Sequence, residues 1–365
     1  MSGLAEFGRF FLPGPTEVLP EVLQAQLQPM IGHRGKGMEA MLAAMQPGLK
    51  AIFGTARPVY ISSSSSTGLM EGAARNGALK RVLALVNGAF AERFHHIARA
   101  TGLATEALPV EWGEVNTPAQ LAEALRSGDF DAVTVVHSET STGALNPIAE
   151  LAATAHAAGD VVLLVDSVSG AAGTELRTDD WALDFVLTGS QKALALPPGL
   201  AFGVANERIL ARAERKPDRG VYFDFLEFER NVGRNQTPNT PALSLLYALE
   251  AQLRRFAEEG LPDRWARHVA MAQTVYRWVE HIRGIGVELS ILAPEGFRTP
   301  TVTCIRLPEP LAGPDVNRAM KERGYTIATG YGKLKEHFIR IGHMGDHTVA
   351  ETERLLAVLE EVLRR

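Results

Sequence analysis

Between residues 58 and 205, short runs rich in valine, leucine and isoleucine alternate with segments in which apolar residues recur every three or four positions. Strands buried on both faces have continuous apolar runs, whereas the longer spacing is typical of amphipathic helices. The alternation therefore predicts an α/β fold, in which helices cover both faces of a mainly parallel sheet. The candidate strands are PVYI, RVLALV, AVTVVH, VVLLVD, DFVLTG and LAFGVA, which begin at residues 58, 81, 132, 161, 184 and 200.

The rhythm changes after about residue 240. Two long amphipathic helices are expected over residues 242–260 and 264–284, each closed by a glycine. The strand-like pieces VELSI, TVTCIRL and HFIRIG and a last helix follow. Near the N-terminus, an apolar stretch is interrupted by Gly14 between two prolines, which indicates an extended arm. We expect an arm over 1–20, a large α/β domain over 21–245, and a small α+β domain over 246–365 that begins with a long connecting helix.

Composition narrows the class of protein. The chain has 365 residues, 46% of them hydrophobic and 22% charged, which suits two globular domains. The net charge of −5 and the lack of a basic run argue against a nucleic-acid partner. No apolar run approaches the roughly 20 residues of a membrane helix, and the N-terminus lacks the pattern of a signal peptide. One cysteine, Cys304, excludes an internal disulfide, so we expect a cytoplasmic protein.

Ligands of parallel sheets bind beyond the carboxyl ends of the strands, and two charged residues stand at such ends. Lys192 is the only charge between Asp184 and Glu207 and has small, apolar neighbours in sequence. Burial lowers the pKa of a lysine, and such an amine forms Schiff bases readily. Asp166 ends VVLLVD, and it is either a helix N-cap or an anion that holds a cationic ring nitrogen.

Four other segments carry candidate chemistry. The serines of Ser62–Gly68 follow a strand and open a helix, so they form either an anion cradle or an ordinary cap. Phe90 follows the turn Asn87-Gly88 and either covers a flat ring or belongs to the core. HSETSTG, residues 137–143, is dense in hydrogen-bonding groups. Arg340 alternates with isoleucines and is either an edge residue or a carboxylate clamp.

Together these segments resemble the class V, fold-type I aminotransferases that use pyridoxal 5'-phosphate (PLP). The nearest group is alanine–glyoxylate and serine–pyruvate or serine–glyoxylate aminotransferase. The sharpest match is the pair VDSVSG and TGSQKALALPPG, with the spacing from Asp166 to Lys192 that the family uses. HSETSTGAL, NGAF and PNTPALSLLYAL also match, and the likeness runs from GPTEV at Gly14 to RIGHMG at Arg340. It implies a seven-stranded-type sheet in the large domain.

The resemblance also implies roles for individual residues. Lys192 binds the cofactor as a Schiff base, and Asp166 holds the ring nitrogen. Phe90 stacks on one ring face, where a relative has tryptophan, and Arg340 binds the substrate α-carboxylate. The remaining cofactor contacts implied are Val168 beneath the ring, Thr140 near its hydroxyl, and Ser65, Ser66, Thr67 and Gln191 at the phosphate, with Thr240 reaching the phosphate of the neighbouring subunit in a homodimer.

Two features depart from the family or carry less weight. The family often has a glycine-bearing Ser-Gly cradle, whereas SSSSST has its glycine afterwards and one residue inserted. This departure blurs by about one position which serines touch phosphate. His33 and Arg34 fall in a segment that lines the substrate site in relatives.

The expected activity is ping-pong transfer of an amino group from alanine or serine to glyoxylate or pyruvate. Lys192 would move the proton of the substrate α-carbon. A phosphoserine or aspartate aminotransferase is the first alternative, because His33, Arg34 and Lys36 offer a second cation. A lyase of the cysteine desulfurase type is the second, although Cys304 is expected to lie in a buried strand. A non-catalytic regulator would need an additional binding module, for which the chain has no room.

Overall fold

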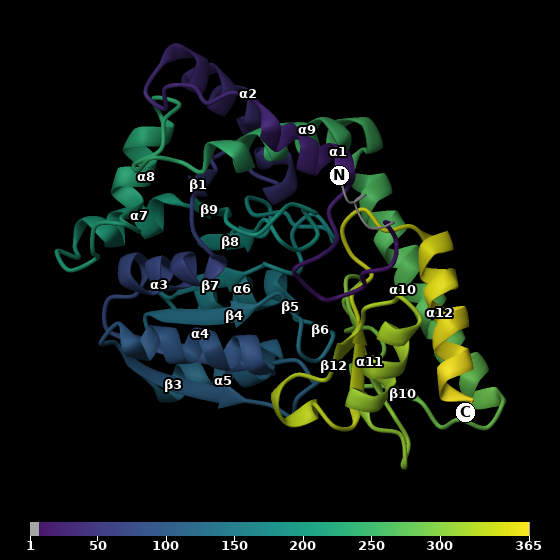
Figure 1. Ribbon diagram of the computed structural model, residues 1–365. Helices are drawn as coiled ribbons and strands as arrows, with labels where there is room; N and C mark the ends of the chain where they lie inside the picture. The colour runs from purple at the N-terminus through teal and green to yellow at the C-terminus, as the bar shows by residue number, and fades with distance from the viewer. Residues whose placement is uncertain (1–6, 365) are drawn as a thin grey trace.

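The core of the molecule is a seven-stranded sheet with the order β1-β9-β8-β7-β4-β2-β3 (Figure 1). The computed structural model describes residues 7–364. Only β9 runs against its neighbours, so the predicted mainly parallel sheet is confirmed. The strands are β1 (Tyr60–Ser62), β2 (Arg81–Val86), β3 (Ala104–Pro109), β4 (Ala132–Val136), β7 (Val162–Asp166), β8 (Phe185–Gly189) and β9 (Ala201–Ala205).

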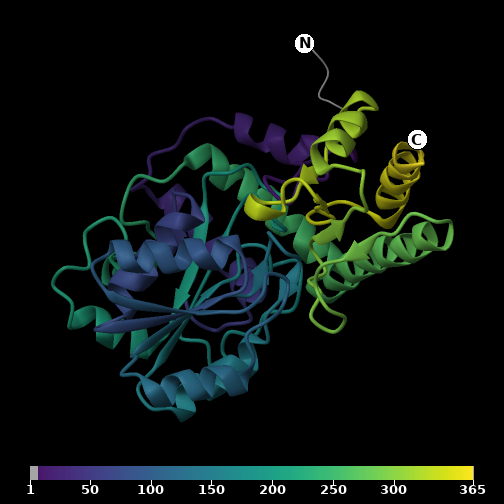
Figure 2. The same ribbon diagram turned by 90° about the horizontal axis from the view of Figure 1, so that it is seen from below.

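Helices cover both faces of this sheet, as Figure 2 shows. Along β7, Leu163 and Val165 join one hydrophobic cluster while Val162 and Leu164 join another on the opposite face. The first face is covered by α2 (Lys36–Phe53), α5 (Pro118–Ser127), α6 (Ile148–Ala157) and α9 (Leu243–Glu259). The second face is covered by α3 (Ser66–Gly77), α4 (Ala89–Ala100), α7 (Glu207–Glu214) and α8 (Phe225–Val232).

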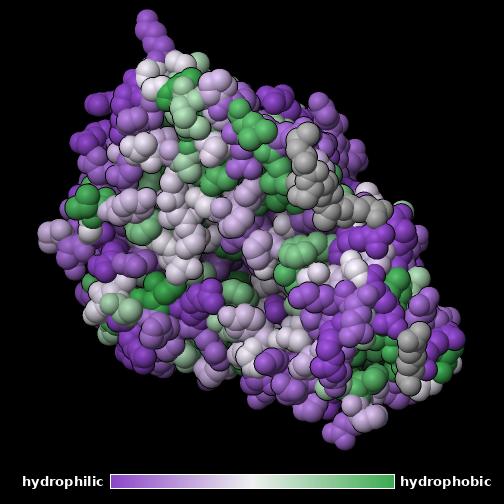
Figure 3. All heavy atoms as spheres, in the orientation of Figure 1, coloured by the Kyte–Doolittle hydropathy of each residue, from purple (hydrophilic) through white to green (hydrophobic). Residues whose placement is uncertain are grey.

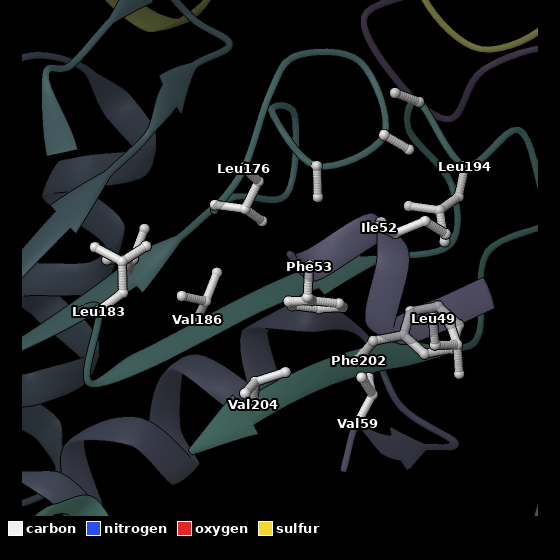
Figure 4. Close-up of a cluster of buried hydrophobic side chains, with 14 of the residues drawn as sticks. Leu49, Ile52, Phe53, Val59, Leu176, Leu183, Val186, Leu194, Phe202 and Val204 are labelled. Carbon is white, nitrogen blue, oxygen red and sulfur yellow. The ribbon is translucent and has the colours of Figure 1, made fainter. Parts of the chain in front are cut away.

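Close packing against β8 and β9 holds helix α2 on the sheet (Figure 4). Leu49 and Phe53 point from the helix toward Val186 and Phe202, and all four side chains are buried. Burying side chains of this size is worth about 1.5–3 kcal/mol each. The short helix α1 (Pro20–Gln24) and the turn η1 (Ala25–Leu27) pack on α9.

A second sheet lies toward the C-terminus and is antiparallel, with the order β10-β11-β13-β12. Its strands are β10 (Ser290–Ile291), β11 (Thr303–Arg306), β12 (Ala328–Thr329) and β13 (Phe338–Ile341). Three helices pack with it, α10 (Leu261–Gly284), α11 (Gly313–Glu322) and α12 (Val349–Leu363), and α10 and α12 lie side by side in both ribbon views. The N-terminal segment joins this layer, because Phe11 is buried there and bonds the carbonyl of Thr326.

Two strand features are absent from the sequence expectations. Strand β3 pairs with β2 at the sheet edge, and its side chains are exposed or half-buried, so ATEALP has no continuous apolar run. A small hairpin, β5 (Ser138–Glu139) and β6 (Ala144–Leu145), lies within HSETSTGAL.

The face in Figure 3 is largely hydrophilic with scattered hydrophobic groups. Within residues 7–364, no helix is both long and apolar enough to cross a membrane.

Candidate active site

One pocket lies beyond the carboxyl ends of the parallel strands. All the residues expected to bind the cofactor line it, except Thr240. Asp166 is the last residue of β7, and Lys192 follows three residues after β8, so the strand ends bring the two side chains together. The lining residues are Ser65, Ser66, Thr67, Met70, Phe90, Arg93, Val136, Ser138, Thr140, Asp166, Val168, Ser169, Gln191 and Lys192.

Lys192 is buried, with 6% of its surface exposed. Its Nζ donates a hydrogen bond to the Pro13 carbonyl and lies 5.7 Å from the centroid of the Phe90 ring. Burial and the charge of Arg340 lower the pKa of Lys192 to about 8, while the Asp166 carboxylate acts in the opposite direction. An amine with this pKa is neutral in about a tenth of the molecules at pH 7, whereas an ordinary lysine amine is almost entirely protonated, and the neutral form is the one that forms a Schiff base.

Asp166 faces the same pocket and is 2% exposed. Its Oδ1 accepts a hydrogen bond from the Val168 N–H at 2.8 Å, and within residues 7–364 its other oxygen has no hydrogen-bond partner. Burial raises the pKa of Asp166 to about 7, and the nearby Glu139 carboxylate adds to the rise. A cationic group placed against the free oxygen would favour the ionised form.

An anion cradle is present where α3 begins. The Ser65 side chain caps none of the first N–H groups of this helix, and although the Gly68 N–H donates to the Ser65 carbonyl, those of Ser66 and Thr67 remain available for a ligand. Ser66 is buried, and its Oγ has no hydrogen-bond partner. A Cβ at Gly189 would collide with that hydroxyl and with the Gln191 amide, so both lie against the same glycine. An orphaned hydroxyl beside free helix N–H groups fits a phosphate group.

Glu139, which the sequence reasoning did not single out, anchors the aromatic wall of the pocket. Its buried carboxylate accepts hydrogen bonds from the N–H groups of Phe90 at 3.1 Å and Ala91 at 3.0 Å, at the start of α4. Burial raises the pKa of Glu139, and its hydrogen bond from Ser141 opposes that rise. Next to it, Thr140 Oγ1 lies 2.5 Å from Ser169 Oγ. The Glu139 carboxylate thus fixes the position of Phe90 at the start of α4.

Arg340 lies on β13 and is largely buried. Its Nε donates to the Thr329 carbonyl at 3.0 Å, and Nη1 donates to the Thr140 carbonyl at 3.1 Å. Within residues 7–364, Nη2 makes no hydrogen bond, so part of the guanidinium fork is available to a ligand. Burial lowers the pKa of Arg340, but a guanidinium stays charged near neutral pH.

Three of the residues that the sequence suggested for the site do not line this pocket. Arg34 donates to the carbonyls of Thr237 at 2.7 Å and Pro238 at 3.1 Å, and neither His33 nor Arg34 lines the pocket of Lys192. Thr240 lines a separate small pocket beside β1. In one chain, therefore, these three side chains are not brought together with Lys192.

Besides Glu139, the structure adds three residues whose place at the site was not predicted from the sequence. Arg93 lines the pocket one helical turn after Phe90, and the spacing of three residues was the only signal for it. Tyr331 lies beside Phe90, with ring centroids 5.4 Å apart. Gly14 passes so close to Lys192 that a Cβ there would collide with the end of the lysine side chain. Neither Tyr331 nor Gly14 has a signal in the local sequence, because their partners are far along the chain.

Comparison with known proteins decides the family. Residues 79–351 match the family model described as aminotransferase class-V. The chain belongs to the class V aminotransferases. It is 37% identical to an uncharacterised aminotransferase of Methanocaldococcus jannaschii over 97% of this chain and 92% of the relative. It is 32% identical to the serine–glyoxylate aminotransferase of Methylorubrum extorquens over 92% of this chain and 86% of the relative. A solved alanine–glyoxylate aminotransferase from Nostoc sp. superposes with a TM-score of 0.91 at 29% identity, over 100% of this chain and 97% of the solved one.

The family makes this chain a PLP-dependent transaminase of fold type I. The pocket fits the cofactor, because the orphaned Ser66 hydroxyl, the Asp166 carboxylate and the buried Lys192 amine suit its phosphate, ring nitrogen and aldehyde respectively. Cys304 lies within β11 and is fully buried, and burial raises the pKa of its thiol to about 12. A thiol in that state is a poor nucleophile, which disfavours the desulfurase alternative.

Proposed function

We propose that this enzyme transfers the amino group of L-alanine or L-serine to glyoxylate or pyruvate in two half-reactions of a ping-pong cycle. The observation that carries the proposal is the position of Arg340: it is not itself among the residues lining the Lys192 pocket, but its Nη1 donates to the carbonyl of the lining residue Thr140, and Nη2 makes no hydrogen bond within residues 7–364. Similarity to serine–glyoxylate and alanine–glyoxylate aminotransferases supports this choice of substrates.

Each part of the site has a task in this proposal. PLP, when bound, withdraws electrons from the substrate α-carbon and makes its C–H bond acidic. Lys192 would take that proton from the α-carbon and deliver it to the C4′ carbon of the cofactor, because its amine is buried in the pocket and its pKa lies near 8. Arg340 binds the α-carboxylate through Nη2, while Asp166 holds the ring nitrogen and Ser66 the phosphate. Phe90 and Val168 exclude water from the two ring faces.

An acidic donor such as aspartate is a second candidate, and Arg93 favours it. This guanidinium lines the pocket with Lys192 and, within residues 7–364, has no carboxylate partner. It lies 4.9 Å from the Phe90 ring centroid and is exposed. A second carboxylate on the substrate would find a cation there, a place that the sequence reasoning gave to His33, Arg34 or Lys36.

We also propose a homodimer in which Thr240 reaches the cofactor phosphate of the other subunit. In its own chain Thr240 lies beside Tyr222, outside the Lys192 pocket. Leu27, Met30 and Val221 are large apolar side chains left exposed, with 85%, 68% and 85% of their surface accessible. Light scattering should give twice the 39.5 kDa chain mass, and a monomer with full activity would refute this arrangement.

A reducing cytoplasm remains the predicted compartment, because the chain has a single cysteine.

The visible spectrum of the purified protein with added PLP tests the activity. We expect a yellow band that Lys192→Ala abolishes, and we expect L-alanine or L-serine to bleach it. Adding glyoxylate or pyruvate afterwards should restore the band. Bleaching by L-aspartate alone would select the second candidate. A band that no amino acid bleaches would refute amino transfer from these donors, and no band at all would refute the role of Lys192.

A further inference from the structure

Tyr331 joins the two sheets of the molecule at the active site. It follows β12 and precedes the short 3-10 helix η2 (Gly332–Leu334). The next residue but one, Lys333, lies 4.6 Å from the centroid of the Trp112 ring. The segment that carries Tyr331 therefore contacts Trp112, which follows strand β3 of the large sheet, as well as belonging to the small sheet.

Three contacts surround the half-buried Tyr331 side chain. The Arg340 guanidinium carbon lies 5.4 Å from its ring centroid, within the range of a cation–π contact. The Phe90 ring centroid is also 5.4 Å away, at an interplanar angle of 38°. At the far end, Tyr331 Oη accepts a hydrogen bond from Arg93 Nη2 at 3.2 Å. One ring thus contacts the proposed carboxylate clamp and the aromatic wall of the pocket, while its hydroxyl is tied to α4.

Arg340 needs such a neighbour. Two carbonyls, those of Thr329 and Thr140, fix Nε and Nη1 in the guanidinium plane, but neither restrains the side chain perpendicular to that plane. An aromatic ring near the guanidinium supplies that restraint and leaves Nη2 free to bind a ligand. A carboxylate bound by an arginine that is already held in place costs less side-chain entropy.

We propose that Tyr331 is a positioning residue of the substrate site, which holds the Arg340 guanidinium for the α-carboxylate of the amino acid. The inference rests on the proposed function of Arg340 as the carboxylate clamp. The ring carries the effect, and the Arg93 hydrogen bond keeps the ring in place. Tyr331 acts through Arg340 and takes no part in the proton transfer at Lys192.

The test compares Tyr331→Leu with the conservative variant Tyr331→Phe in PLP-loaded protein. Tyr331→Leu should weaken binding of propionate, a carboxylate without an amino group, about 5-fold by calorimetry, and raise the KM for the amino donor by a similar factor with a smaller change in kcat. Tyr331→Phe should stay within about twofold of wild type, because it loses the hydrogen bond from Arg93 but keeps the ring and its contact with Phe90. The affinity for PLP should be unchanged in both variants.

Two controls separate positioning from general damage. Tyr276 makes a similar contact with Arg298, whose guanidinium carbon is 5.0 Å from its ring centroid, and it does not line the Lys192 pocket. Tyr276→Leu should therefore leave propionate affinity unchanged. In an Arg340→Gln background, Tyr331→Leu should have no additional effect, because the group it positions is gone.

Several outcomes would overturn the inference. These are wild-type affinity in Tyr331→Leu, equal losses in the leucine and phenylalanine variants, persistence of the leucine effect without Arg340, and no propionate binding by wild type. Absence of amino transfer in wild type would instead refute the proposed function. The propionate affinities would still decide whether Tyr331 positions Arg340, because they do not depend on turnover.

Discussion

Replacing Gly14 by alanine should disable Lys192 while leaving the fold intact. Gly14 has φ of +108° and passes directly against the lysine side chain. An added Cβ would lie closer than 3.0 Å to Lys192 Cδ, Cε and Nζ. Ordinary contacts between carbon atoms are about 3.5–4.0 Å, so the end of the lysine side chain must move by about 1 Å.

Two costs of this substitution can be separated by magnitude. The left-handed backbone conformation costs a non-glycine residue about 1–2 kcal/mol of folding free energy. The collision adds little to that cost, because the atoms met are at the end of a flexible side chain. For the reaction, however, a displacement of about 1 Å can lower the rate about 100-fold. We therefore expect modest destabilisation and a severe loss of kcat.

Gly102→Ala is the matched control. Gly102 has φ of +87° in the turn after α4, and a Cβ there would meet nothing within 4 Å. This variant should show the conformational cost alone, with wild-type kcat. Urea unfolding should give similar losses of stability for both variants, and the visible band formed with PLP should be weakened or slow to appear only in Gly14→Ala. Wild-type kcat and an unchanged band in Gly14→Ala would refute the reasoning that the N-terminal arm packs against the reactive amine.

The remaining predictions concern the cofactor pocket. Because burial lowers the Lys192 pKa to about 8 and only the neutral amine attacks, the rate of PLP attachment to cofactor-free protein should rise with pH and level off above about 8; a rate still rising tenfold per unit near pH 10 would contradict this. Asp166→Asn should lower kcat at least about 100-fold, since an amide cannot stabilise the cationic ring nitrogen, and a near-normal kcat would count against that role. Ser66→Ala should raise the Kd for PLP about 10-fold or more in a fluorescence titration. Ser64→Ala should not, because the Ser64 hydroxyl bonds Ser62 outside the pocket. Equal effects of the two substitutions would refute the role of Ser66 in binding phosphate.

The α/β class and most strands of the large sheet could be predicted from local sequence patterns. Strand β7, for example, is apolar at consecutive positions because both sheet faces are covered, and such a run is visible without coordinates. Strand β3 was not predicted, because it lies at the sheet edge and its side chains are exposed or half-buried. Pairing with β2, and not burial, defines this strand. The order of the strands and the reversed direction of β9 depend on contacts between distant segments.

The candidate site divides in the same way. Asp166 and Lys192 could be found from the sequence because each stands at or just after a strand end, and strand ends of a parallel sheet meet at one edge. The anion cradle at Ser66 could be located because a helix begins there, but only the structure shows which hydroxyl is buried without a partner.

Other parts of the site exist only in three dimensions. The sequence by itself determined the α/β class, the lysine–aspartate pair and the family likeness, because these follow from short-range patterns. The tertiary structure decided that Gly14 lies against Lys192 and that Tyr331 stands beside Phe90. Those contacts join segments far apart in the chain, and no local spacing encodes them, since they depend on how the N-terminal segment and the small sheet pack against the large sheet.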